Sequence, residues 1–468
     1  MIKEFEIRKT DISLDFRLDT SYYYFSKIIK ELSKKDGVTY QKLQCLCENI
    51  SDGEHSAIPR QRKSGKRYLY GRNIRDGIVN YDPITDKSYI SEENYLRFPR
   101  IHLEENDILL TIVGTIGKTA LYKQEYIGEA GIPRHIAKIR LKKECGVSPE
   151  YIISFFLSKL GQWQLNNITT GNIQPLLSIG NIEKLDIPII KKNIHDKVTL
   201  KQRIFIQHEI NALNLISQAT QLLYSKININ FKTIEIQNDF SVRKSILKAS
   251  DLWTPMYSYP LYVNTLKAIK NKWQTICIGD IADLIKGNEV GSEEYATFLD
   301  KRKTDVPFIR TSDVVNHEID QYPDFYIPKE IYYELNQGFK SGDVLFTKDG
   351  KIGMVGMLTK YDRAIISSGF VGLRLNEKAA DHGITPEYLF LTLSIKEIGT
   401  YAARRRTVIA STIPHLRDER LKEIEIPILD EETIAEVTRL VKQAFLLKDE
   451  KKRLIAEVRD IIDTYFEV

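Results

Sequence analysis

The C-terminal tract of the chain carries the strongest hydrophobic pattern. Its apolar positions step by three and four residues in constant phase: Val437, Leu440, Ala444, Leu447, Leu454, Val458, Ile461 and Tyr465. Lys451 is the polar interruption of this stripe, and charged residues such as Lys448 and Glu450 occupy the other faces. This spacing over about four heptads predicts one long amphipathic helix.

A second tract, residues 197–229, shows a looser stripe of the same kind. Its apolar positions are Ile206, Ile210, Leu213, Ile216, Leu223 and Ile227. At about 1.5 Å per residue, each helix would be about 50 Å long. We expect the two helices to pair as an intramolecular coiled coil that separates two globular units like a strut. The alternatives are that each helix packs on its own domain or on another protein.

The chain is a tandem repeat. Four landmarks recur in the same order, displaced by 236 to 239 residues. They are Asp107–Thr111 with Gly114–Lys118 against Asp343–Thr347 with Gly350–Gly353, Gly71–Ile74 against Ile309–Ser312 (a loose match), Pro149–Ile152 against Pro386–Leu389, and Leu185–Ile189 against Ile424–Ile428. Units of this length are duplicated domains rather than solenoid repeats.

Each unit has the same predicted order of elements. Short β-like runs, residues 107–113 and 343–346, are bounded by Gly and Asp turn signals. Helical segments, residues 151–165 and 388–404, follow the Pro-Glu-Tyr sequences, because proline in the first turn beside glutamate is a helix-start signal. An extended Ile-Pro segment and a long helix complete each unit.

Composition narrows the class of protein. The chain has 468 residues, 42% of them hydrophobic and 28% charged, as in globular proteins of about two to four domains. We see neither the roughly 20 apolar residues of a membrane span, nor the apolar core of a secretory signal, nor a Cys-x-x-Cys pair among the four cysteines. We therefore expect a cytoplasmic protein with no membrane partner, no zinc ribbon and no disulfide framework.

Recognisable catalytic motifs are missing from the sequence. Gly117-Lys118-Thr119 ends like a phosphate-binding loop, but Ile112 stands where the first glycine is required. Tyr81-Asp82-Pro83-Ile84 has one proline where the catalytic loop of an amino-methyltransferase has two, and the eight histidines show no metal-ligand spacing. We expect no catalytic residues, no metal and no cofactor of the protein's own.

Basic clusters indicate a nucleic-acid partner, which the net charge of +5 permits. Arg and Lys on glycine-containing loops suit DNA phosphates, and Arg also suits the edge of guanine. The candidate DNA-binding residues are Arg60, Arg62, Lys63, Lys66, Arg67, Arg72 and Lys118 in the first unit and Lys301, Arg302, Lys303, Arg310, Lys348, Lys351, Arg404, Arg405 and Arg406 in the second. The alternative for each cluster is a solvated loop. The glycine turns at residues 114–118 and 349–353 are candidates for clamping a phosphate with backbone amides.

The chain resembles the specificity subunit of type I restriction-modification systems. The resemblance covers nearly the whole length and rests on short motifs that occur twice in the same order. These are DILLTIVGTIGK (107–118) and DVLFTKDGKIGMVG (343–356), the PEYI and PEYL helix starts, and TGNIQPL (170–176) and TIPHL (412–416) before the long helices. The chain departs from the usual pattern at Ile-Gln-Pro in the first unit and at GKIGM in the second.

The resemblance implies an α+β fold with two target-recognition domains, residues 1–190 and 236–428. Conserved spacers, residues 191–235 and 429–468, would contain helices 196–230 and 431–466, paired as an antiparallel coiled coil. Such a subunit is non-catalytic and reads an asymmetric bipartite site on double-stranded DNA. Methyltransferase subunits, two of them in the usual assembly, would bind S-adenosylmethionine, and a restriction subunit would bind ATP with Mg.

Three other readings remain open on the residues alone. The chain is a DNA reader of another phage-defence system, a duplicated coiled-coil scaffold that binds protein, or an enzyme without familiar motifs. Steep salt dependence of DNA binding would separate a reader from a scaffold.

Overall fold

The computed structural model describes residues 37–61, 64–75, 77–81, 88–170, 175–237, 239–248, 252–287, 290, 305–410 and 413–467, with 23, 26–28, 31 and 32. Five candidate DNA-binding residues lie outside the described residues: Arg62, Lys63, Lys301, Arg302 and Lys303. The chain comprises two compact units, unit 1 (Met1–Gln207 with Arg453–Val468) and unit 2 (His208–Lys452). Each unit therefore contains part of both long helices.

Unit 1 is built on a six-stranded sheet in the order β2-β10-β7-β8-β5-β4. Its strands are β2 (Cys47–Asp52), β10 (Ile136–Leu141), β7 (Ile108–Thr111), β8 (Thr119–Leu121), β5 (Gly77–Val79) and β4 (Ile74–Arg75). A three-stranded sheet contains β6 (Tyr89–Ile90), β3 (Lys66–Tyr68) and β9 (Ala130–Gly131), and a two-stranded sheet pairs β1 (Thr39–Lys42) with β11 (Asp186–Ile189). The helices are α2 (Leu43–Leu46), η2 (Gly71–Asn73), α3 (Glu92–Arg97), η3 (Pro99–Ile101), α4 (Gln124–Ile127), α5 (Pro149–Leu157), α6 (Lys159–Asn167), α7 (Ile179–Glu183) and the start of α8 (Lys192–Ile227).

Unit 2 repeats this plan on a four-stranded sheet in the order β13-β21-β18-β19. Its strands are β13 (Ala282–Ile285), β21 (Phe370–Leu375), β18 (Val344–Thr347) and β19 (Val355–Met357). Smaller sheets contain β17 (Tyr326–Ile327), β14 (Val306–Ile309) and β20 (Ile365–Ile366), then β15 (Val314–Val315) with β16 (Glu318–Ile319), β12 (Thr275–Cys277) with β24 (Glu425–Pro427), and β22 (Val408–Ala410) with β23 (Ile413–His415). The helices are η4 (Phe231–Thr233), α9 (Lys244–Lys248), η5 (Pro255–Ser258), α10 (Pro260–Lys272), α11 (Ile278–Ile281), η7 (Thr311–Asp313), α12 (Lys329–Leu335), α13 (Glu377–Ala380), α14 (Pro386–Ser394), η8 (Lys396–Thr400), α15 (Tyr401–Arg405), α16 (Asp418–Lys422) and α17 (Glu431–Phe466).

Equivalent contacts explain the repeated sequence landmarks. The Asp107 carboxylate accepts two hydrogen bonds from the Arg140 guanidinium, at 2.8 and 2.9 Å, and Asp343 accepts the same pair from Arg374 at 2.8 and 2.7 Å. Each pair joins neighbouring strands of its sheet. Both aspartates are buried, so the landmark residues hold the sheet together.

The tyrosine of each Pro-Glu-Tyr sequence has a structural role as well. The hydroxyl of Tyr151 donates to the Pro188 carbonyl at 2.7 Å, and that of Tyr388 donates to the Pro427 carbonyl at 2.9 Å. Burial raises the pKa of both phenols, which therefore remain donors. The motif thus attaches α5 and α14 to the Ile-Pro strand of its own unit.

The predicted single helices after these motifs are wrong, because each is broken in two. Ser158 adopts an extended conformation between α5 and α6 and caps α6 by accepting from the amide of Gly161. The backbone at Gly161 lies so close to the preceding helix that a Cβ there would be 1.9 Å from the carbonyl oxygen of Phe155. In unit 2, a Cβ on Gly399 would likewise be 1.9 Å from the carbonyl oxygen of Leu393. A glycine at this position permits the same break in both units.

The loose alignment of Gly71–Ile74 with Ile309–Ser312 is also wrong, by two residues. The equivalent turns are η2 and η7, each between its three-stranded sheet and a short hairpin. In η2 the amide of Tyr70 donates to Asn73 Oδ1 at 2.8 Å, and in η7 the amide of Arg310 donates to Asp313 Oδ2 at 2.9 Å. Tyr70 is therefore the counterpart of Arg310.

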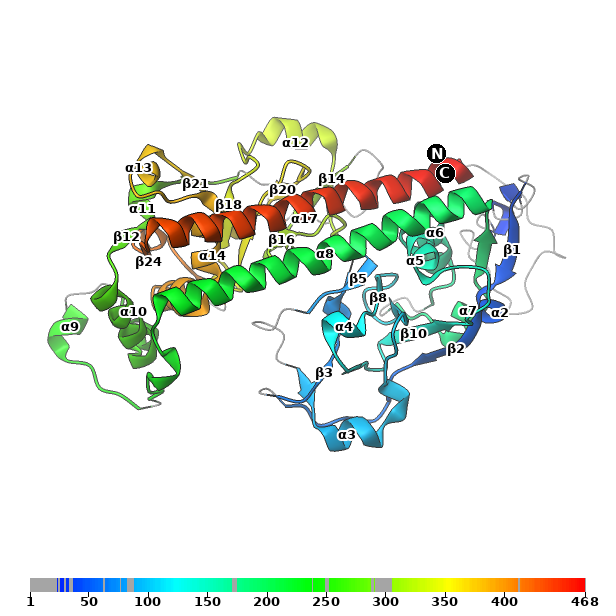
Figure 1. Cartoon of the computed structure of the whole chain (residues 1–468), viewed down its shortest axis with the longest axis horizontal. Coiled ribbons are helices and arrows are strands. Elements are labelled where there is room, and N and C mark those ends of the chain that lie inside the picture. The colour runs from blue at the N-terminus through cyan, green and yellow to red at the C-terminus, as the bar shows by residue number, and fades with distance from the viewer. Residues whose placement is uncertain are drawn as a thin grey trace. The chain divides into compact units, whose positions relative to one another are not determined.

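The two long helices, α8 and α17, have 36 residues each (Figure 1). Within unit 2 they pack together and antiparallel, since Glu209 contacts Lys448 whereas Lys226 acts electrostatically on Asp430. Most predicted seam residues are buried: Ile206, Ile210, Leu223, Ile227, Val437, Leu440, Leu454 and Val458; Leu213, Leu447 and Ile461 are half-buried. In unit 2 the same helices also belong to the core of the domain, because Val344, Leu389 and Ile426 share their hydrophobic cluster. In unit 2 the long helices therefore pair with each other and also pack on the domain of that unit.

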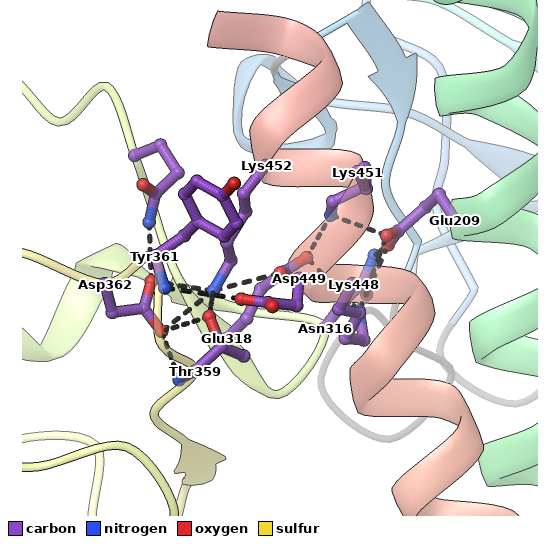
Figure 2. Close-up of polar contacts among 11 residues, drawn as sticks. Glu209, Asn316, Glu318, Thr359, Tyr361, Asp362, Lys448, Asp449, Lys451 and Lys452 are labelled. Carbon is purple, nitrogen blue, oxygen red and sulfur yellow. Dashed lines mark hydrogen bonds and ion pairs between the residues drawn. The ribbon is translucent and has the colours of Figure 1, made fainter.

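A layer of buried charges interrupts this apolar seam in unit 2 (Figure 2). Lys451 Nζ lies 2.6 Å from Glu209 Oε2 and also pairs with Glu318. Lys448, whose side chain is fully buried, lies 3.4 Å from Glu209 and 3.2 Å from Glu318. Lys452 pairs with Asp362 at 2.7 Å. Three lysines of α17 thus neutralise three carboxylates from α8 and from two segments of the domain.

Candidate nucleic-acid interface

The turn η2 forms an exposed corner of unit 1. Asn73 accepts from the amide of Tyr70, and its Nδ2 donates to the Asn80 carbonyl at 2.7 Å, so a side-chain amide fixes the turn. A Cβ on Gly71 would lie 3.7 Å from Thr111 Cγ2, which places η2 against the end of β7.

Two arginines flank the tyrosine of this corner. The guanidinium carbon of Arg60 lies 4.9 Å from the centroid of the Tyr70 ring, and that of Arg72 lies 4.8 Å from it. Arg60 is also 5.9 Å from the ring of Tyr68, which packs edge-on against Tyr70. Both arginines are exposed, whereas Tyr70 is half-buried and its hydroxyl accepts from Ser88 Oγ at 3.2 Å. The tyrosine ring thus supports two solvent-facing cations.

Sequence reasoning missed two further members of this corner, Arg134 and His135. Both are exposed. Burial, followed by the charges of Arg134 and Arg60, lowers the pKa of His135, so the imidazole is neutral at pH 7. The sequence signal is weak, because one basic dipeptide before a strand has no counterpart in the second unit.

The corresponding corner of unit 2 has different chemistry. The Arg310 guanidinium lies 3.2 Å from Asp313 and 3.3 Å from Asp324, and stacks over Phe325 at 4.3 Å. Here the cation is paired with carboxylates of its own domain.

The glycine amides of the two glycine turns bond to backbone carbonyls of the protein, so the phosphate clamp expected at the two turns stays a prediction for their other amides. The amide of Gly114 donates to the Pro175 carbonyl at 3.2 Å, and that of Gly117 donates to the Thr111 carbonyl at 3.2 Å. In unit 2 the amide of Gly350 donates to the Pro414 carbonyl at 3.1 Å. The glycines are needed for backbone conformation, since Gly114 and Gly117 have φ of 78° and 84°.

The described candidate cations fall into two groups. Arg60, Arg72, Lys351 and Arg404 are exposed, and Lys118 is half-buried. Six further candidates contact acidic side chains or backbone carbonyls of the protein: Lys66 with Glu92 and Glu129, Arg67 with the Ile127 carbonyl, Arg310 as above, Lys348 with Asp418, Arg405 with the Tyr257 carbonyl and Arg406 with Glu423. Burial lowers the pKa of Arg405, although its guanidinium remains charged.

Other kinds of site are not evident in the part of the chain that is described. All four cysteines are free thiols. Among the described residues there is no group of His, Cys, Asp or Glu that could hold a metal ion, and no described helix is long and apolar enough to cross a membrane.

Comparison with known proteins finds one family match and several similar solved structures. Residues 270–440 match the family model of the type I restriction modification DNA specificity domain. The chain is similar to the solved type I restriction-modification S subunit from M. genitalium, with 13% identity, coverage of 92% of this chain and 95% of that one, and a TM-score of 0.35. It is also similar to the HsdS subunit from Thermoanaerobacter tengcongensis, with 14% identity, 92% and 97% coverage, and a TM-score of 0.29. The search of curated proteins finds no match.

The matched region is the second copy of a fold whose strand order and motif contacts recur in unit 1. Residues 270–440 therefore form a region similar to the type I restriction modification DNA specificity domain, within the second of two copies of one fold.

Proposed function

We propose that this chain is a non-catalytic DNA specificity subunit of the type I restriction-modification class, which reads an asymmetric bipartite sequence on double-stranded DNA, one half with each repeat. The difference between the two equivalent corners carries the proposal. Tyr70 supports two exposed arginines in unit 1, whereas its counterpart Arg310 is held by Asp313 and Asp324 in unit 2. Two readers with one fold and different polar surfaces suit two different half-sites, because base readout depends on the side chains presented.

The proposed division of labour follows from the class. Residues 1–190 and 236–428 act as recognition domains, and residues 191–235 and 429–468 act as spacers that dock methyltransferase subunits, with a restriction subunit where one exists. Those partners bind S-adenosylmethionine, and ATP with Mg, in the cytoplasm. Because adenine methylation requires a base extruded from the duplex, the reader must bind DNA beside the partner that extrudes it.

A genome-wide map of modified bases, recorded with and without this gene, tests the proposal. The expected result is loss of N6-methyladenine from one asymmetric bipartite motif when the gene is deleted. An unchanged map in a strain whose methyltransferase partner is expressed would contradict it.

A further inference from the structure

We infer that Tyr70 is the positioning residue of a phosphate clamp, in which Arg60 and Arg72 contact the DNA backbone at the half-site read by unit 1. The inference rests on the proposed function, since it assumes that unit 1 meets DNA. It adds the residue that organises the contact, which is itself uncharged.

Geometry is the first argument. Tyr70 contacts both guanidinium groups, at 4.9 and 4.8 Å from its ring centroid, although Arg60 and Arg72 come from opposite sides of strand β3 in the sequence. Exposed arginines ordinarily lose side-chain entropy when they bind a phosphate. Stacking on a fixed ring holds both guanidinium groups near the corner beforehand and so reduces that loss.

The ring itself is anchored. The amide of Tyr70 donates to Asn73, its hydroxyl accepts from the buried Ser88, and its edge packs on the buried Tyr68. These contacts come from the backbone, the loop before β6 and the core. The support is therefore rigid, whereas the arginines that it carries face solvent.

Charge distinguishes this corner from its counterpart. The Tyr70 corner has two exposed guanidinium groups, and Arg134 adds a third positive charge that acts on His135 together with Arg60. In unit 2, Arg310 faces two carboxylates. Basic groups gathered at one exposed corner attract a phosphate, whereas the two carboxylates beside Arg310 repel one.

Binding of the full chain to a fluorescent 30-base-pair duplex of mixed sequence, titrated with salt, tests the clamp. Replacing both Arg60 and Arg72 by Ala removes two phosphate contacts and should reduce the slope of log K against log salt by about 1.8. Tyr70→Leu should weaken binding roughly 5- to 30-fold at constant salt, as expected for the loss of two cation–π contacts. Tyr70→Phe retains the ring and should bind within about twofold of wild type, a rescue that a merely structural role of the hydroxyl would not give.

Two controls separate the clamp from general effects. Tyr333→Leu removes an exposed tyrosine of unit 2 that contacts Arg363, and Arg439→Ala removes an exposed arginine of α17 that pairs with Glu436. Both should retain the wild-type salt slope, and the thermal unfolding midpoint of every variant verifies folding.

The outcomes are distinct. A folded Tyr70→Leu variant with wild-type affinity and salt slope would overturn the clamp alone. Loss of one base from the methylated motif with an unchanged slope would also overturn it, because the arginines would then read a base. A wild-type chain that does not bind the duplex would overturn the proposed function together with the clamp.

Discussion

Substitution of Lys451 by Met tests whether the buried charges hold unit 2 together. Lys451 Nζ contacts Glu209 and Glu318, and its side chain is only 11% exposed. Burial by itself raises the pKa of the Glu318 carboxyl, but Lys448, Lys451 and Lys452 outweigh burial and hold the pKa below its ordinary value. Methionine keeps most of the aliphatic stem, so the substitution removes charge rather than packing.

The expected loss of stability follows from the carboxylate charge that the substitution leaves without its partner. Removing one partner of a buried ion pair costs about 3–5 kcal/mol, because the remaining charge is uncompensated. Lys448 still lies 3.4 Å from Glu209 and 3.2 Å from Glu318, so the lower end, about 3 kcal/mol, is expected. For a unit of this size that corresponds to a decrease of about 6–12 °C in the unfolding midpoint.

Thermal unfolding by circular dichroism measures the decrease, and hydrogen exchange locates it. Exchange should rise in the β15–β16 hairpin, which carries Glu318, and stay unchanged in the β2–β10 strands of unit 1. Arg439→Met, on the exposed face of the same helix, is the matched control and should leave the midpoint unchanged. A Lys451→Met midpoint within 2 °C of wild type (about 1 kcal/mol or less) would refute the reasoning.

A second variant tests whether the buried charges contribute net stability. Replacing Glu209, Glu318, Lys448 and Lys451 together by apolar residues leaves no charge of these pairs unpaired, and such replacements are often neutral or stabilising. We therefore expect a midpoint at or above that of wild type. A decrease as large as that of the single variant would mean that the network contributes net stability.

The remaining predictions concern the fold and the spacer. Tyr388→Phe leaves the Pro427 carbonyl without its donor and should cost about 1–2 kcal/mol, measured as a shift of the urea midpoint; an unshifted midpoint would contradict this. The pKa of Glu318 is lowered in the folded state, so its stabilising contribution is complete above about pH 4.3 and is lost as the pH falls toward the folded pKa. Between pH 6 and pH 3 the thermal midpoint of wild type should therefore fall further than that of Glu318→Gln. An equal fall in both proteins would count against the network. Four residues inserted into both α8 and α17 should lengthen the unread gap of the methylated motif, and an unaltered gap would argue against the helices as the spacer.

The motifs that occur twice in the chain make contacts that stabilise the fold of each unit. The repeated Asp–Arg pairs and the tyrosine hydroxyl bonds lie inside each unit, while the corners at η2 and η7 share backbone geometry and differ in exposed side chains. A duplicated fold whose corners differ suits the reading of two different sequences, since exposed side chains can change without loss of the core.

Local periodicity was sufficient to predict several features. The three- and four-residue spacing located both long helices, and the repeated landmarks located the duplicated units, because an amphipathic helix and a repeat are both readable from residue spacing. α8 nevertheless ends at Ile227, before the expected residue 230, since Asn228 has a positive φ of 48°.

Only the tertiary structure decided which charged residues are available. Lys66 pairs with Glu129, and Lys348 pairs with Asp418, each with a partner more than 60 positions away. Likewise, Lys451 reads as a defect of an apolar seam until Glu209 and Glu318 are found beside it. The physical reason is that a helix face or a turn depends on neighbouring residues, whereas the protonation and exposure of a cation depend on carboxylates brought beside it by the folded chain.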